Sequence, residues 1–160
     1  MNLGKPQTYE LELRDDEPYR LSRDGGPCKF SKPASSAKHP KLYTLSADAK
    51  LIYVGVASQS MASRLTFGFR ANGKGGYYGY RWKVLRHPLV LNVWTADSDG
   101  KPSTLRDLET IEAEVAFLCR QRSGQWPTHQ HEIHFYQSSA QHRAAAAQIY
   151  DRAVESVADA

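Results

Sequence analysis

The sequence has little cysteine and no long apolar run, and these absences exclude several classes of protein. Only Cys28 and Cys119 occur in 160 residues, too few for a disulfide framework or a zinc site, so both are expected to be reduced. No segment has the roughly 20 consecutive apolar residues that a membrane span needs, and residues 1–18 lack the apolar core of a signal peptide. We therefore expect one domain with no membrane partner, in the cytoplasm or on the nucleoid.

Acidic residues are missing from the middle of the chain. Residues 49–96 contain no Asp or Glu but seven bases: Lys50, Arg64, Arg70, Lys74, Arg81, Lys83 and Arg86. The whole chain has a net charge of +4, so this stretch carries +7 and the rest −3. Such asymmetry is typical of proteins that bind polyanions such as nucleic acids. The alternative is an ordinary solvated surface on which the bases gather by chance.

Hydrophobic periodicity and turn residues predict an α+β fold with a small, mostly antiparallel three-stranded sheet flanked by helices. The expected elements are a hairpin (42–45 and 51–56), a helix within 58–73, a strand (88–96) and helices at 103–124 and 140–157. Further strands are expected at 8–13 and 132–136, and 73–83 read as a glycine-rich, aromatic loop. We expect a single domain over 1–160, with a core at 41–127, an N-terminal extension (1–40) and a C-terminal strand and helix (128–160).

The predicted helix ends rest on capping residues. Ser58 or Ser60 can begin the first helix, and Gly73 can end it. Thr104 with Asp107 resembles a capping box, and Gly124 is a stop signal for the second helix.

Two tyrosines on the predicted hairpin are the first candidate site residues. A loop centred on Asp48 places Tyr43 directly opposite Tyr53, and a slip of one position makes them diagonal neighbours. Adjacent phenols can bind a phosphate or a water molecule, although an aromatic pair that only packs is the simpler interpretation. Gly55 permits close approach at the strand end, and Arg64 on the next helix offers a planar cation that matches phosphate oxygens.

In this order and spacing, the residues resemble the GIY-YIG nuclease superfamily. Leu42-Tyr43-Thr44 stands where that family has its GIY motif, and Tyr53-Val54-Gly55 where it has YIG, with the ten-residue tyrosine spacing usual there. Arg64 matches the family's helix arginine. The run from Glu114 to Arg120 matches its pattern of an acid, two residues, two apolar residues and a base. The resemblance covers about residues 42–122.

The resemblance implies a DNA endonuclease that uses one Mg²⁺ or Mn²⁺ ion. Glu114 would be the sole protein ligand of the metal, Arg64 would bind the scissile phosphate, and Tyr43 would take a proton from the attacking water. Tyr53 would orient the water or the phosphate. Helical periodicity alone does not choose Glu114 over Glu112; the family pattern does.

Two departures from the family pattern remain. The family has a His or Tyr shortly after the arginine, where this chain has Gly68; Tyr78 or Tyr80 can fill that role from the loop, and Tyr78 is favoured. The asparagine that follows the family's glutamate is absent, and His129 or Gln130 can replace it. His129, His131 and His134 alone make a weak zinc signal.

The basic, aromatic loop is the predicted nucleic-acid contact. Its candidate residues are Arg70, Lys74, Tyr80, Arg81 and Lys83, which can follow a DNA backbone or stack on bases. Double-stranded DNA is the expected partner. Two alternatives stay open: a nucleic-acid-binding module of the same fold that does not cut, and a nuclease specific for RNA or single strands.

Overall fold

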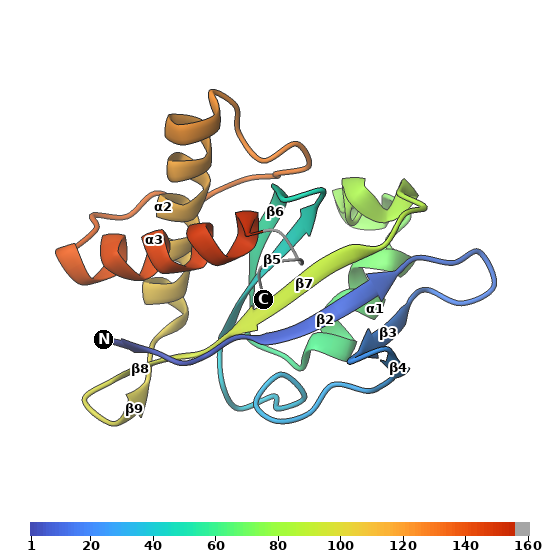
Figure 1. The fold of residues 1–160 in the computed structure, drawn as a ribbon, viewed down its shortest axis with the longest axis horizontal. Helices are drawn as coiled ribbons and strands as arrows, with labels where there is room; N and C mark the ends of the chain where they lie inside the picture. Colours follow the sequence, from blue (N-terminus) through green and yellow to red (C-terminus); the bar gives the residue numbers. More distant parts are fainter. Residues whose placement is uncertain (156–160) are drawn as a thin grey trace.

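The computed structural model describes residues 1–155 and confirms the α+β class (Figure 1). The main sheet has six antiparallel strands in the order β4-β3-β2-β7-β5-β6. They are β2 (Gln7–Glu12), β3 (Arg20–Arg23), β4 (Gly26–Pro27), β5 (Lys41–Ala47), β6 (Lys50–Ala57) and β7 (Leu89–Trp94). A small second sheet joins β1 (Asn2–Leu3), β8 (Ala96–Ser98) and β9 (Lys101–Pro102) in the order β1-β8-β9.

The three predicted central strands form only half of the main sheet. β7, β5 and β6 are neighbours, but the N-terminal segment adds β2, β3 and β4 on the other side of β7. β2 pairs with β7 from Gln7 opposite Val93 to Leu11 opposite Leu89. The expected three-stranded sheet is therefore wrong, and the N-terminal segment contributes three of the six strands. The alternation at 8–13 predicted a strand but could not identify its distant partner.

The β5–β6 hairpin does not have the register that a loop centred on Asp48 predicts. Its turn is made by Asp48 and Ala49, both with positive φ (48° and 55°), which is the turn geometry of tight hairpins. An irregularity between Leu45 and Ser46 then shifts the pairing. As a result Tyr43 lies opposite Gly55, and Tyr53 lies opposite Leu45. The two tyrosines are diagonal neighbours, the second of the two arrangements expected.

Three helices complete the fold: α1 (Met61–Arg70), α2 (Leu105–Ser123) and α3 (Ala140–Val154). Ser60 caps α1 by accepting a hydrogen bond from the Ser63 N–H. The predicted capping box of Thr104 and Asp107 begins α2, and Gly124, with φ +82°, ends it. Two 3₁₀ turns lie between α1 and β7, namely η1 (Lys74–Gly76) and η2 (Arg81–Val84).

The strand expected at residues 132–136 does not form, because the edge of β6 is already covered by the residues just before it. The His129 N–H donates to the Ile52 carbonyl at 2.9 Å. The Gln130 side-chain amide donates to the Val54 carbonyl at 3.0 Å and accepts from the Val54 N–H at 3.1 Å. These contacts use the backbone groups that a further strand would need.

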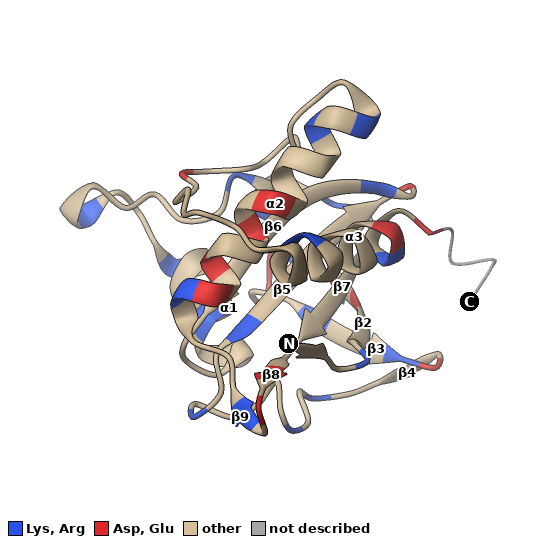
Figure 2. Ribbon diagram, turned by 90° about the vertical axis from the view of Figure 1, so that its left-hand side faces the viewer, with Lys and Arg blue, Asp and Glu red and all other residues tan. Residues whose placement is uncertain are grey.

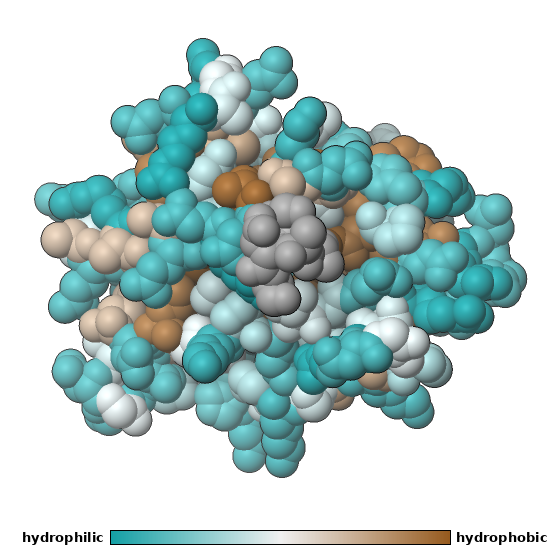
Figure 3. Space-filling view, viewed as in Figure 1, coloured by the Kyte–Doolittle hydropathy of each residue, from teal (hydrophilic) through white to brown (hydrophobic). Residues whose placement is uncertain are grey.

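Helices cover both faces of the sheet, and alternate residues of each strand enter two different cores (Figure 1). Tyr43, Leu45 and Tyr53 pack with Leu65 of α1 on one face. Leu42 and Val54 pack with α2 and α3 on the other. No helix within residues 1–155 is long and apolar enough to cross a membrane. The face seen in Figure 3 is mostly hydrophilic, with apolar colour in small separate areas.

Candidate active site

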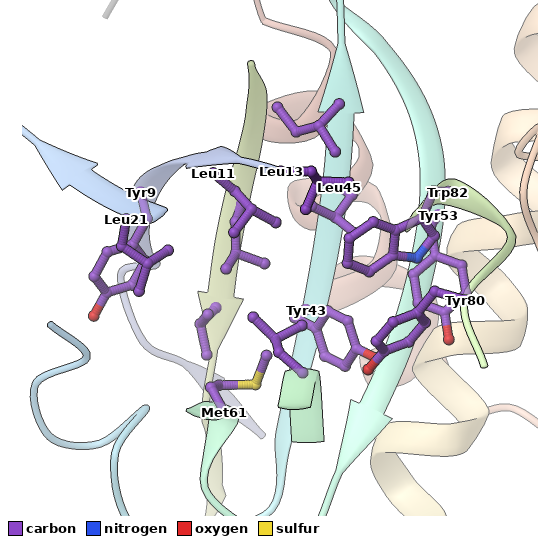
Figure 4. Packing of buried hydrophobic residues seen from close by; sticks show 14 of the residues in the cluster. Tyr9, Leu11, Leu13, Leu21, Tyr43, Leu45, Tyr53, Met61, Tyr80 and Trp82 are labelled. Atoms are coloured by element: carbon purple, nitrogen blue, oxygen red, sulfur yellow. The ribbon is translucent and has the colours of Figure 1, made fainter. Parts of the chain in front are cut away.

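Three tyrosines meet on the α1 face of the sheet. Tyr43, Tyr53 and Tyr80 are each at most 5% exposed. The ring centroid of Tyr53 lies 5.8 Å from those of both Tyr43 and Tyr80. The hydroxyl ends of Tyr43 and Tyr80 point toward each other (Figure 4), and their oxygen atoms are 3.1 Å apart. Trp82 stacks on Tyr80 with ring centroids 4.4 Å apart. The cluster therefore places several phenol oxygens within one small buried region.

Two glycines make room for these rings. A Cβ atom at Gly55 would lie 2.7 Å from Cε1 of Tyr53 and 2.9 Å from the hydroxyl oxygen of Tyr43. A Cβ atom at Gly68 would lie 2.1 Å from Cε2 of Tyr80. All three distances are shorter than carbon and oxygen atoms tolerate without movement. Gly68 stands where the GIY-YIG pattern has a His or Tyr, and the ring of Tyr80 occupies that space.

Tyr80, and not the favoured Tyr78, therefore completes the cluster. Tyr78 is 73% exposed, and its ring rests against Gly73, where a Cβ atom would come within 2.5 Å of its Cε1. The loop turns so that Tyr80 faces the sheet and Tyr78 faces outward. This arrangement also removes Tyr80 from the expected set of nucleic-acid contacts, because a buried ring cannot stack on a base.

Arg64 brings a positive charge to the phenols. Its Nε donates to the Tyr43 hydroxyl at 3.4 Å, and its guanidinium carbon lies 5.7 Å from the Tyr80 ring centroid. Burial alone would lower the pKa of Arg64, but the neighbouring phenols, Tyr43 first, raise it above its ordinary value. Within residues 1–155, no carboxylate forms an ion pair with this guanidinium. Arg64 is thus a half-buried cation open to an anionic ligand.

The hydroxyl protons form an ordered chain. Tyr80 donates its single proton to the Arg64 carbonyl at 3.3 Å. Tyr43 must then be the donor in the bond between the two phenols, and it accepts from Arg64 on its other side. Burial raises the pKa values of Tyr53 and Tyr80 above the ordinary value, so both stay protonated at neutral pH. Tyr43 is the phenol in direct contact with the guanidinium.

Glu112, and not Glu114, is the buried glutamate of α2. It is 7% exposed, and its charge acts on both Arg64 and Tyr53. Burial raises the pKa of Glu112 to about 8, repulsion from Glu109 adds to the increase, and the charge of Arg64 opposes it. In the described part of the chain, no group donates a hydrogen bond to its carboxylate.

Glu114 cannot share this position because two residues correspond to a rotation of about 200° around a helix. Its side chain leaves α2 on nearly the opposite side, and it is half-buried there. Glu112 lies one turn after Leu108 and one turn before Ala116, which both pack in the core between α2, α3 and the sheet. The resemblance implies Glu114 as the metal ligand, whereas the glutamate that α2 buries is Glu112, two positions earlier.

The segment after α2 places two polar side chains, those of Gln130 and His131, beside β6 and Tyr53. Gln130 binds the backbone of β6 and so holds the edge of the strand that carries Tyr53. The ring of His131 lies 6.2 Å from that of Tyr53, and its Nε2 accepts from the Arg81 backbone N–H at 3.4 Å. Burial, followed by the charge of Arg81, lowers the pKa of His131, so the ring is neutral at neutral pH.

The seven bases of the acid-free stretch have different surroundings. Arg86 pairs with Asp15 at 2.9 Å, and the Lys83 Nζ donates to two backbone carbonyls at 2.9 and 3.0 Å. Lys83, a candidate nucleic-acid contact in the sequence, thus binds the backbone of α1's C-terminal side and of the loop. Figure 2 shows several acidic residues along α2, with basic residues at both of its ends and over the surrounding loops. Of these seven bases, the exposed ones that form no ion pair within residues 1–155 are Lys50, Arg70, Lys74 and Arg81.

Comparison with known proteins adds no family assignment. No family model, curated protein or solved structure matches the chain. In residues 1–155 there is also no group of three or more His, Cys, Asp or Glu side chains able to hold a metal ion. A metal bound near the phenols would therefore have Glu112 as its protein ligand and take its other ligands from water or substrate.

Proposed function

We propose that the protein is a metal-dependent endonuclease of the GIY-YIG kind that hydrolyses phosphodiester bonds of DNA. One observation carries this proposal: Arg64, which contacts Tyr43 and has no carboxylate partner within residues 1–155, is close enough to the buried Glu112 for their charges to interact. An unpaired cation beside an enclosed carboxyl group that a metal ion could ionise suits a substrate that brings an anion together with a divalent cation, as a phosphate does.

Arg64 is the proposed phosphate ligand. Its guanidinium remains charged at any working pH, and one of its N–H groups is used by Tyr43 while the others are free to bind oxygen. The phosphate gains negative charge as the attacking oxygen adds to it. A cation held in a site of low water content stabilises that charge more strongly than one in bulk solvent.

Tyr43 is the proposed proton acceptor for the attacking water. A free phenol has a pKa of about 10, so this role requires positive charge close to the hydroxyl. The contact from the Arg64 Nε supplies it. Tyr43 can accept the water proton only as the phenolate, after its own proton has passed to solvent; the Tyr80 hydroxyl can then turn from the Arg64 carbonyl and donate to Tyr43, which gives the phenolate two hydrogen-bond donors. Tyr53, diagonal to Tyr43, would orient the water or the phosphate, as expected from the sequence.

The residues present fit one Mg²⁺ or Mn²⁺ ion. Burial makes the Glu112 carboxylate unfavourable as a free anion, and a divalent cation would offset that cost. Magnesium is usually bound by one or two carboxylates, with water and phosphate oxygens as the remaining ligands, so a single glutamate is sufficient. When bound, the metal supplies neutralisation of charge on the phosphate and on the leaving oxygen.

The exposed bases Arg70, Lys74 and Arg81 support DNA as the partner, because they add positive charge on the segment that carries Arg64 and Tyr80. A DNA-cleaving role also agrees with the cytoplasmic or nucleoid location expected from the sequence.

Nicking of a supercoiled plasmid in Mg²⁺ tests the proposal. We expect the wild type to nick the plasmid and Glu112→Gln to be slower by on the order of 10²–10³-fold, the usual cost of losing a transition-state contact. Glu114→Gln is the matched control on the same helix and should cut at nearly the wild-type rate. Salt-dependent DNA binding without cutting by the wild type would instead support the non-catalytic binding module.

A further inference from the structure

Two cavities meet at His131, beside the phenol cluster. The first has a volume of about 690 Å³, and its lining includes Tyr78, Arg81 and His131. The second has a volume of about 350 Å³, and its lining includes His131, Trp126 and Phe135. Both cavities have His131 in their lining, so they adjoin at its ring on the surface between the loop before η2 and the segment after α2. We call this surface, formed by Tyr78, His131, Trp126 and Phe135, the stacking surface.

The aromatic side chains of the stacking surface face solvent. Tyr78 is 73% exposed, Phe135 is 69% exposed and Trp126 is 47% exposed. Three large exposed rings around two hollows are unusual for a surface without a ligand, since burying each ring would be favourable. Aromatic rings of this kind are the platforms on which unpaired bases stack, at a gain of about 1–3 kcal/mol per base.

The stacking surface begins at the candidate active site. The His131 ring lies 6.2 Å from Tyr53, and the charge of Arg64 acts on both His131 and Tyr77, which also lines the first cavity. A nucleotide in the first cavity would therefore adjoin the phosphate held by Arg64. The volume of that cavity lies within the usual range for small-molecule sites, which is about 300–1,000 Å³.

The charges along this surface fit a nucleic-acid strand. Arg81 and Lys83 line the first cavity, and Glu132 is the single acid in its lining. The lining of the second cavity has no charged side chain, which suits the flat faces of bases more than their phosphates. Bases in a duplex are already stacked and paired, so they can reach side chains only after flipping out, at a cost of a few kcal/mol.

We infer that the DNA strand cut by this protein has unpaired nucleotides next to the scissile phosphate, and that their bases stack on Tyr78 and Phe135 on either side of His131. The position of these nucleotides next to a scissile phosphate rests on the proposed function. Binding of an unpaired strand to the stacking surface does not, and it can be measured without any cleavage.

The test is the affinity for a fluorescent oligothymidylate without metal, measured by anisotropy, beside a duplex of equal length. We expect Tyr78→Ala and Phe135→Ala each to weaken oligothymidylate binding roughly 5- to 100-fold and to change duplex binding little. Phe117→Ala is the matched control, because Phe117 is 48% exposed but lines neither cavity, and it should bind like the wild type. Tyr78→Trp should keep the wild-type affinity, since it preserves a flat ring.

The outcomes separate this inference from the proposed function. Unchanged oligothymidylate binding in both alanine variants, or an equal loss in Phe117→Ala, overturns the stacking surface even if the protein cuts DNA. Equal losses for single strand and duplex overturn the preference for unpaired bases. Selective losses in a protein that never cuts would support the stacking surface and refute the nuclease. Melting temperatures equal to that of the wild type show that each variant is folded.

Discussion

Replacing Glu112 with glutamine gives the sharpest test of its burial. The amide has nearly the size of the carboxyl group but no ionisable proton. Folding raises the pKa of Glu112 from its ordinary 4.5 to about 8. Between these pH values the folded protein keeps a proton that the unfolded chain has released, so the free energy of unfolding falls as pH rises. Stability from this group is fully present below pH 4.5 and is lost as pH rises through about 8.

The size of the Glu112 pKa change sets how strongly the free energy of unfolding depends on pH. Each pH unit between 4.5 and about 8 changes the free energy of unfolding by about 1.4 kcal/mol, which gives an upper limit of roughly 5 kcal/mol. Glu112→Gln lacks this dependence. It should be as stable as the wild type near pH 5 and more stable by up to that amount at pH 8.5, with EDTA present to remove metal.

Urea unfolding followed by tryptophan fluorescence, at pH values from 5 to 9, measures this difference. Glu114→Gln should follow the wild type, because its parent carboxylate is not enclosed in the same way. Mg²⁺ at pH 8 should raise the melting temperature of the wild type and leave Glu112→Gln unchanged, since only binding to the folded state stabilises it. Parallel pH profiles for the wild type and Glu112→Gln, or an equal response of both to Mg²⁺, would refute the reasoning.

Three further predictions address the phenols, the surface charge and the glycines. Tyr43→Phe should lower the free energy of unfolding, measured in urea, by only about 0.5–1.5 kcal/mol, the usual value of one hydrogen bond. The rate of single-turnover cleavage should fall by at least about 100-fold. A near-normal cleavage rate would show that Tyr43 has only a structural role. For DNA binding, the slope of log K against log salt should be about −3 or −4 in the wild type, and Arg81→Ala should make it less steep by about one. Arg86→Ala is the control and should leave the slope unchanged, because Arg86 pairs with Asp15. A wild-type affinity independent of salt would contradict the polyanion interpretation. Gly68→Ala should destabilise the protein by about 1–3 kcal/mol despite the better helix propensity of alanine, because its Cβ displaces the Tyr80 ring; a melting temperature at or above that of the wild type would contradict the close contact.

The parts of the fold that the sequence predicted well are those that depend on neighbouring residues. Thr104, Asp107 and Gly124 define the ends of α2 because caps act within one turn of the helix. The hairpin was predictable for the same reason, but its register was not. The irregularity between Leu45 and Ser46 has no sequence signature as strong as a turn or a cap, and it moved Tyr43 opposite Gly55.

The parts that the sequence could not predict depend on contacts between distant segments. The alternation in β2 shows which side chains point inward, but the pairing with β7 depends on which strand edge is free after the rest has folded. The side of α2 that carries Glu112 is a similar case. Its apolar residues spread over more than half of the helix surface, so periodicity does not show which buried position a carboxylate can occupy.

Gly68 and Tyr80 show how a phenol can occupy the space beside α1 although the residue that provides it lies further along the chain. A side chain at position 68 and the ring of Tyr80 would compete for one space, because the Cβ of any larger residue would enter the ring. Gly79 carries the same constraint on the backbone: with φ +75°, a Cβ atom there would lie 2.0 Å from the Gly68 carbonyl oxygen. The loop can therefore approach α1 closely only with glycine at both positions, and that approach carries the Tyr80 hydroxyl to Tyr43. A sequence comparison that looks for a His or Tyr shortly after Arg64 finds only Gly68. In the folded protein, the phenol ring of Tyr80 lies in the space beside Gly68.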